Sequence, residues 1–229
     1  MNLIERHASK TLKKFAGEFP AVLITGARQT GKTTILKSYT DEQGIDSLTF
    51  DDPQEELSAK TDPKAFMEFH KSPYMFDEIQ YVPELFRYIK MSIDMDRHNG
   101  MFFLTGSQQV PLAEKASESL AGRVGILQLY PLSQREIRKD TFDAPFIPNK
   151  EYINYMFQRF KIFEYSVEET WNAIFKGGYP ELVATNIDSN DFFSSYVKTY
   201  IQRDINKLTQ IENEMQFMQF ITVVASRTG

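Results

Sequence analysis

The run Gly26-Ala27-Arg28-Gln29-Thr30-Gly31-Lys32-Thr33 has the residue types and the spacing of a phosphate-binding loop, G-x-x-x-x-G-K-[ST]. Its two glycines let the backbone bend so that successive N–H groups point at phosphate oxygens, and the helix beginning near Lys32 directs its positive end at the same oxygens. The Lys32 ammonium suits the β- and γ-phosphates, and the Thr33 hydroxyl suits Mg²⁺. The residues predicted to contact the nucleotide are Gly26, Ala27, Arg28, Gln29, Thr30, Gly31, Lys32, Thr33 and Thr34.

An acidic pair, Asp77-Glu78, follows the short apolar run 74–76. In a P-loop sheet the strand beside the phosphate loop ends in an aspartate that holds Mg²⁺, and an adjacent glutamate can deprotonate the attacking water. Two acids at a strand end are by themselves compatible with solvated loop charges. Because a phosphate loop lies about 45 residues upstream, we interpret Asp77 as a metal ligand and Glu78 as the catalytic base.

Two further polar residues are candidates for catalysis. Ser107, in the run Thr105-Gly106-Ser107-Gln108, follows a strong strand and is placed to bond the γ-phosphate or the lytic water; an ordinary strand-to-helix turn is the alternative. Arg123 follows Gly122 before the last strand, where its guanidinium could reach the γ-phosphate of a neighbouring subunit as an arginine finger. A surface arginine is the alternative for this residue.

These residues need a parallel sheet to bring them together. Short apolar runs alternate with helical patterns, which is typical of an α/β fold with parallel strands. The predicted strands are 21–25, 46–50, 74–76, 101–105 and 124–129. The predicted helices are 3–16, 32–39, one from Pro63 to about 71, 83–96 and 111–121.

The pattern changes after Pro131, where only helical periodicity remains. We therefore predict a P-loop ATPase core at 1–138, a linker at 139–149, and a helical lid or the start of a C-terminal domain at 150–229. The predicted fold is α/β, a three-layer P-loop NTPase with a parallel sheet and a C-terminal all-helical subdomain. Within the helical part, Ser166 and Glu169 predict a capping box for a helix that ends at Gly177-Gly178.

Composition excludes several other classes of protein. The chain has 229 residues, no cysteine and a net charge of −5, so thiolate metal sites, disulfides and a uniformly basic nucleic-acid surface are not supported. No apolar run approaches the roughly 20 residues that cross a bilayer, and the first residues do not form a secretory signal. We expect a cytoplasmic protein without a membrane partner.

Taken in order, these motifs resemble those of an AAA+-type P-loop ATPase, and most closely the AAA-14 type of prokaryotic family. Members of that family carry a separate C-terminal domain of unknown function, DUF4143. The resemblance rests on phrases along nearly the whole chain: ITGARQTGKTT (24–34), FDEIQ (76–80), LTGS (104–107), SLAGR (119–123), LYPLSQREI (129–137), GGYPELV (177–183) and YIQRDI (200–205).

The resemblance implies that Lys32 and Thr33 bind phosphate and magnesium, that Asp77 binds magnesium, and that Glu78 is the base. It also implies a sensor role for Ser107 and a finger role for Arg123. Arg203 is the best candidate for a second sensor arginine. We expect the chain to lack most of DUF4143, because that domain would begin near 227–229.

Two functions use the same predicted site, with ATP and Mg²⁺ as its ligands. The first is an ATPase that remodels or moves a macromolecular partner, a protein or a nucleic acid, with a homo-oligomer as one arrangement. The alternative is a slow nucleotide-controlled switch that signals through its helical part. A GTPase is disfavoured because N-K-x-D is absent, and a small-molecule kinase because it has no need of Glu78 as a water-activating base.

Overall fold

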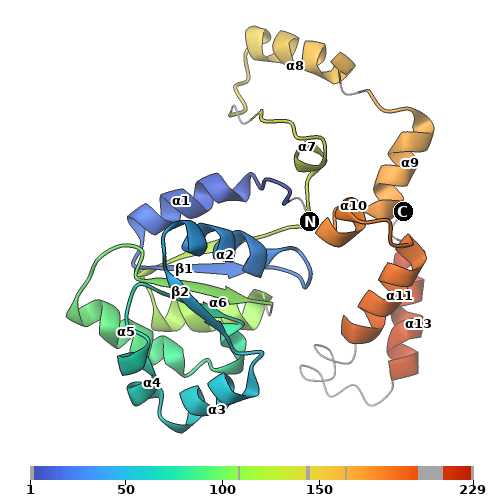
Figure 1. Ribbon diagram of the computed structural model, residues 1–229. Helices are drawn as coiled ribbons and strands as arrows, with labels where there is room; N and C mark the ends of the chain where they lie inside the picture. The colour runs from blue at the N-terminus through green and yellow to red at the C-terminus, as the bar shows by residue number, and fades with distance from the viewer. Residues whose placement is uncertain (1–2, 108, 143–144, 163, 201–213, 228–229) are drawn as a thin grey trace. The chain divides into compact units, whose positions relative to one another are not determined.

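Five parallel strands form one sheet in the computed structural model, which describes residues 3–107, 109–142, 145–162, 164–200 and 214–227 (Figure 1). The order across the sheet is β2-β3-β4-β1-β5, so the strand that enters the phosphate loop lies between β4 and β5. The strands are β1 (Ala21–Thr25), β2 (Asp46–Thr49), β3 (Tyr74–Asp77), β4 (Phe102–Gly106) and β5 (Val124–Gln128). The predicted parallel α/β sheet is confirmed.

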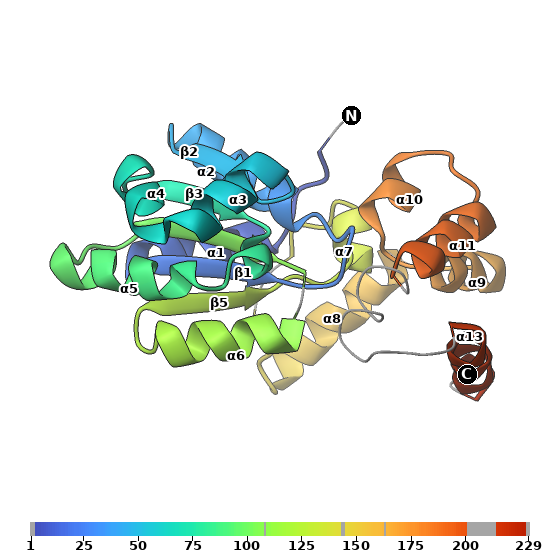
Figure 2. The ribbon, with the colours of Figure 1, turned by 90° about the horizontal axis from the view of Figure 1, so that it is seen from below.

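Helices cover both faces of this sheet (Figures 1 and 2). The core helices are α1 (Ala8–Glu18), α2 (Lys32–Glu42), α3 (Pro53–Thr61), α4 (Pro63–Phe69), η1 (Ile79–Tyr81), α5 (Leu85–Met95), α6 (Gln109–Ser119) and α7 (Gln134–Ile137). The later helices are α8 (Lys150–Ile162), α9 (Val167–Lys176), α10 (Pro180–Ala184), α11 (Ser189–Tyr200) and α13 (Glu214–Ala225).

Alternating side chains of β1 divide the core into two layers. Val22 and Ile24 pack with α1 and α2 on one face, whereas Ala21 and Leu23 pack with α3 to α6 on the other. All five residues of β1 are buried, which explains why this strand reads as a continuous apolar run. The result is a three-layer arrangement with β1 near its centre.

Side-chain caps begin several helices, including two that the sequence analysis does not predict. Asp62 caps α4 by accepting from the Ala65 N–H, as Pro63 at the first helical position suggests. Asp52, before Pro53, caps α3 in the same way, so the signal for this missed helix is present in the sequence. The second missed helix, α7, begins with a capping box between Ser133 and Glu136.

The chain divides into two compact units, Met1–Ala184 and Thr185–Gly229. Two hydrogen bonds join residues on either side of the predicted linker at 139–149. The Leu132 N–H donates to the Gly178 carbonyl at 2.6 Å, and Arg138 Nε donates to the Tyr165 hydroxyl at 2.7 Å. These bonds attach residues beyond 149 to the first unit.

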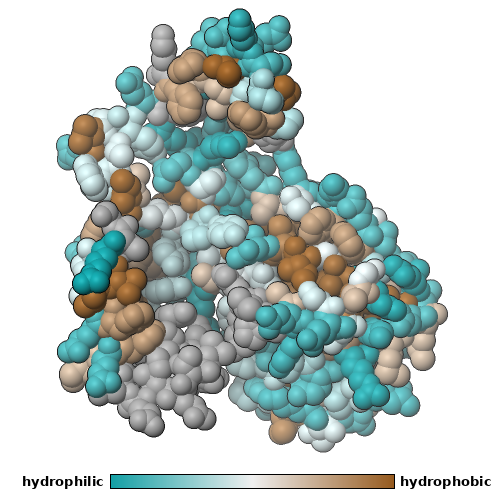
Figure 3. Space-filling model, turned by 180° about the vertical axis from the view of Figure 1, so that it is seen from behind, coloured by the Kyte–Doolittle hydropathy of each residue, from teal (hydrophilic) through white to brown (hydrophobic). Residues whose placement is uncertain are grey.

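Apolar side chains also reach the surface (Figure 3). On α9, which has the predicted Ser166–Glu169 capping box, four apolar residues at helical spacing are exposed: Val167, Trp171, Ile174 and Phe175. Within the residues that the structure describes, no helix is both long enough and apolar enough to cross a membrane.

The close approach of Gly178 to Leu132 gives a stability prediction. A Cβ on Gly178 would lie 2.2 Å from the Leu132 carbonyl oxygen, so Gly178→Ala must displace backbone. We expect the free energy of unfolding to fall by about 1–3 kcal/mol, measured by denaturant or thermal unfolding. The matched control is Gly17→Ala, since a Cβ there meets nothing within 4 Å and alanine favours helix. An equal effect of both substitutions would contradict the prediction.

Candidate nucleotide site

The phosphate loop connects β1 to α2 and is held in a tight turn. Gly31 has a left-handed φ of 90°, and Gln29 is a non-glycine residue with a φ of 60°. A Cβ on Gly26 would lie 2.2 Å from the Leu129 carbonyl oxygen, which leaves no room for a larger residue. The Ala27 carbonyl accepts from Lys32 Nζ at 2.8 Å and from Thr30 Oγ1 at 2.9 Å. Together these features keep the loop compact at the start of α2.

The loop meets the acidic strand end directly. Thr33 Oγ1 donates to Asp77 Oδ1 at 2.8 Å, although the two residues lie 44 positions apart. The sequence analysis places the Asp77 strand beside the loop strand, which is wrong, because β4 lies between β1 and β3. The residues still meet, because all the strands are parallel and their carboxyl ends lie at one edge of the sheet.

Thr105, at the end of the intervening strand β4, joins the two acids. Its hydroxyl donates to Asp77 Oδ1 and accepts from the Glu78 N–H at 3.0 Å. The side chain is fully buried. The sequence analysis favours Ser107 over this residue. The sequence shows that Thr105 lies near the end of a strand, but not that this strand lies between the other two.

Glu78 occupies a strained position at the edge of the sheet. Its φ of 57° is left-handed, and its carboxylate accepts from Gln80 Nε2 and lies 3.5 Å from Ser107 Oγ. Burial raises the pKa of Glu78, against the lowering effects of the Gln80 hydrogen bond and the Lys32 charge. The predicted base is therefore held by two polar neighbours, of which sequence reasoning identifies only Ser107.

Arg123 is not brought to this site. It immediately precedes β5, and its carbonyl accepts from the N–H of Ala21, the first residue of β1, so it lies at the amino edge of the sheet. Its Nε donates to Asp94 Oδ1 at 2.6 Å. Arg203, the candidate second sensor, lies outside the described residues.

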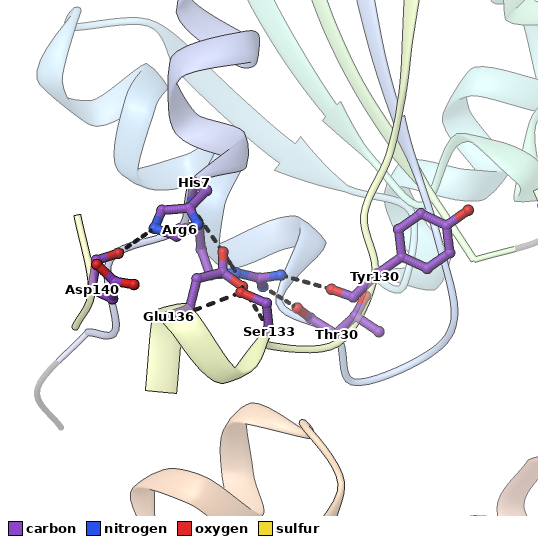
Figure 4. A network of polar contacts seen from close by, with 7 residues as sticks. All are labelled: Arg6, His7, Thr30, Tyr130, Ser133, Glu136 and Asp140. Carbon is purple, nitrogen blue, oxygen red and sulfur yellow. Dashed lines mark hydrogen bonds and ion pairs between the residues drawn. The ribbon is translucent and has the colours of Figure 1, made fainter. Parts of the chain in front are cut away.

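A second set of contacts joins the loop to the start and end of the core (Figure 4). The Arg6 guanidinium donates to the Thr30 carbonyl at 2.7 Å, to the Tyr130 carbonyl at 2.6 Å and to Glu136 Oε1 at 3.0 Å. Burial raises the pKa of Glu136, but hydrogen bonds from Ser133, His7 and Arg6 together bring it below its ordinary value. The sequence analysis does not select Arg6 or Glu136, because their meeting across 130 positions leaves no local pattern.

A cavity of about 630 Å³ opens beside the loop, within the first compact unit. The loop side contributes Gln29, Gly31 and Thr34, and the N-terminal segment contributes residues 3–6. Pro180 and Glu181 complete part of the wall. The cavity thus lies against the same turn that the glycines form.

The sheet order, the phosphate loop and the adjoining acidic pair define an AAA+-type P-loop ATPase fold. The chain belongs to the AAA_14 family, because the model of that family, an AAA domain, matches residues 18–138. A second model, a domain of unknown function (DUF8612), matches residues 167–229. This match lies within the helical part of the chain, whereas the sequence analysis expects DUF4143 to begin near residue 227.

Two curated relatives are themselves uncharacterised proteins, Rv2008c from Mycobacterium tuberculosis and Mb2031c from Mycobacterium bovis. Each is 28% identical to this chain over 218 residues, which is 90% of this chain and 41% of the relative. The chain thus spans about two fifths of the length of these relatives. Among solved structures, the Walker-type ATPase PABY2304 of Pyrococcus abyssi is similar in fold, with a TM-score of 0.53 at 16% identity, over 91% of this chain and 75% of that one.

Proposed function

We propose that the protein binds ATP with Mg²⁺, hydrolyses it, and uses the hydrolysis to remodel or move a macromolecular partner. The observation that carries this proposal is the 2.8 Å contact between Thr33 Oγ1 and Asp77 Oδ1. It joins the hydroxyl of a phosphate loop to a carboxylate from a different strand. Hydroxyl and carboxylate oxygens are the ligand types that Mg²⁺ accepts alongside phosphate and water.

The phosphate groups of ATP are assigned to the turn at 26–34. Lys32 now donates to the loop carbonyl of Ala27, and its flexible stem allows the ammonium to exchange that acceptor for a phosphate oxygen. The metal, when bound, neutralises charge on the phosphate oxygens. Thr33 and Asp77 are the residues that would hold it.

Glu78 is the proposed base that accepts a proton from the attacking water. Ser107, 3.5 Å from its carboxylate, is proposed to orient that water or the γ-phosphate. The Thr105 hydroxyl bonds both the backbone N–H of Glu78 and the carboxylate of Asp77, so it fixes the position of the base relative to the metal ligand. We assign the base and ribose of ATP to the adjoining cavity, whose volume is sufficient for a nucleoside.

The test is ATP turnover with Mg²⁺ and with excess EDTA, repeated in the presence of DNA, RNA or protein. We expect turnover only with the metal, and a severalfold stimulation by the class of macromolecule that is the partner. Turnover that is unaffected by EDTA would contradict the assignment of the metal. A protein that retains nucleotide for minutes and responds to none of these partners would instead be the slow switch. The hydrogen bond from Gln80 Nε2 to the Glu78 carboxylate favours this alternative, because it occupies the proposed base.

Arg123 gives a prediction about assembly. Because it lies at the amino edge of the sheet, away from the loop of its own chain, we propose that it acts only on the nucleotide of a neighbouring subunit. Arg123→Ala should lower turnover per subunit about a thousandfold or more under conditions where the protein is oligomeric, measured alongside mass in solution.

The control for Arg123 is its ion-pair partner, Asp94→Asn, which disturbs the same pair but leaves the guanidinium. Equal losses from the two substitutions, or a loss from Arg123→Ala in a strict monomer, would exclude a finger acting between subunits.

A further inference from the structure

One side chain from outside the phosphate loop, that of Arg6, joins the loop to two other segments of the chain. Arg6 lies just before α1, is 9% exposed, and donates to three acceptors in three different segments: Thr30 in the loop, Tyr130 after β5, and Glu136 in α7 (Figure 4). A guanidinium has five N–H donors in a rigid plane, so it can hold three acceptors at fixed angles. A lysine at this position has no such geometry.

The acceptor in the loop is the carbonyl of Thr30, directly before Gly31. In a trans peptide the carbonyl and the following N–H point to opposite sides of the chain. Arg6, by fixing the Thr30 carbonyl on its own side, therefore turns the Gly31 N–H to the other side. The Thr30 side chain fixes the preceding turn as well, because its hydroxyl donates to the Ala27 carbonyl at 2.9 Å.

Arg6 is itself fixed by Glu136. This carboxylate is 6% exposed and accepts from Arg6 Nε at 3.0 Å, from the His7 N–H at 2.8 Å and from the Ser133 N–H at 2.7 Å. The N–H groups of His7 and Ser133 thus hold the carboxylate in one orientation together with the guanidinium. The ion pair is nearly buried, so removal of either partner leaves an uncompensated charge or unpaired donors.

We propose that Arg6 is a positioning residue of the nucleotide site: its guanidinium sets the orientation of the Thr30–Gly31 peptide, and Glu136 holds the guanidinium in place. The proposal rests on the function proposed above. It adds a residue outside the loop, the acidic pair and the sensor positions, and it assigns Glu136 of α7 a role in nucleotide affinity.

The experiment compares Arg6→Met, Arg6→Lys and Glu136→Gln with the wild type in two assays. The first is the Kd for ATP and for ADP by calorimetry; the second is amide hydrogen exchange of residues 26–34 without nucleotide, with Tm recorded for each variant. Arg6→Met should weaken both nucleotides about tenfold or more and speed exchange in the loop. Arg6→Lys should not restore the wild-type values, because one ammonium cannot hold three separate acceptors.

The matched control is Arg97→Met, which removes an exposed arginine that donates to the Gly122 carbonyl at 3.2 Å. It should leave the Kd and the loop exchange unchanged. A folded Arg6→Met protein with wild-type Kd and wild-type loop exchange would overturn the proposal, even if its Tm is lower. If that variant does not fold, wild-type loop exchange in Arg6→Lys or Glu136→Gln overturns it equally.

The exchange assay also separates this proposal from the proposed function. If the wild type binds neither nucleotide, the proposed function fails, whereas faster loop exchange in Arg6→Met still supports the positioning role. If the wild type binds ATP and all the Arg6 and Glu136 variants match it in both assays, only the positioning role fails.

Discussion

Replacing Lys32 with alanine is expected to reduce the affinity for ATP about ten- to a hundredfold. The substitution removes the ammonium group that we assign to the phosphates, and a charge-assisted hydrogen bond contributes about 1.5–3 kcal/mol. It also removes the 2.8 Å bond from Lys32 Nζ to the Ala27 carbonyl, which helps to close the loop. Calorimetric titration with ATP and Mg²⁺ measures the change directly.

The control for this prediction lies on the same helix. Lys37, also in α2, is exposed, so Lys37→Ala removes the same side-chain type and charge without touching the loop. Its ATP affinity should equal that of the wild type. If Lys32→Ala retains wild-type affinity, the phosphate loop is not the nucleotide site, and the proposed function is wrong.

Replacing Glu78 with glutamine is expected to stop turnover while ATP remains bound. Glutamine keeps the size and the hydrogen-bonding reach of glutamate but cannot accept a proton from water at neutral pH. General-base catalysis contributes about 10²–10⁴-fold, so single-turnover hydrolysis should fall by that range while the Kd for ATP changes little. Because Gln80 donates to the carboxylate of Glu78, the amide oxygen of the variant can still accept this bond.

Glu84→Gln is the matched control for Glu78→Gln. Glu84 is exposed at the start of α5 and its side chain makes no capping bond there. The Glu84→Gln substitution removes one carboxylate from a neighbouring segment, so it reproduces only the change in net charge that Glu78→Gln makes. Wild-type hydrolysis by Glu78→Gln would remove this residue from the mechanism; equal losses in both variants would point to charge rather than to proton transfer.

Local patterns determined the framework of the site. The phosphate-loop motif, the apolar run 21–25 and the acids at 77 and 78 are each contiguous in sequence, and each depends on only a few neighbouring residues. The same holds for helix starts, where Ser166–Glu169 and Asp62–Pro63 both form the caps that their types predict. A cap or a loop of this kind is defined by backbone geometry over one turn, so sequence is sufficient to find it.

The sequence also contains the cap residues of two helices, α3 and α7, that periodicity does not predict. Asp52–Pro53 begins α3 by the same chemistry as Asp62–Pro63, and Ser133–Glu136 forms the same capping box as Ser166–Glu169. Helix α7 has only 4 residues, and α3 has 9 residues and follows directly after a predicted strand. Apolar periodicity over such short segments does not distinguish a helix from a loop, although the cap residues are clear.

Only the tertiary structure decided which distant residues complete the site. Parallel strands align their carboxyl ends whatever their separation in the chain, and the sheet order places Thr105 of β4 between the loop strand and Asp77. The Arg6–Glu136 pair forms across 130 positions because packing, rather than spacing in the sequence, brings the two side chains together. The sequence by itself determined which chemical groups are present and their local turns; the order of strands and the long-range packing decided which of those groups meet.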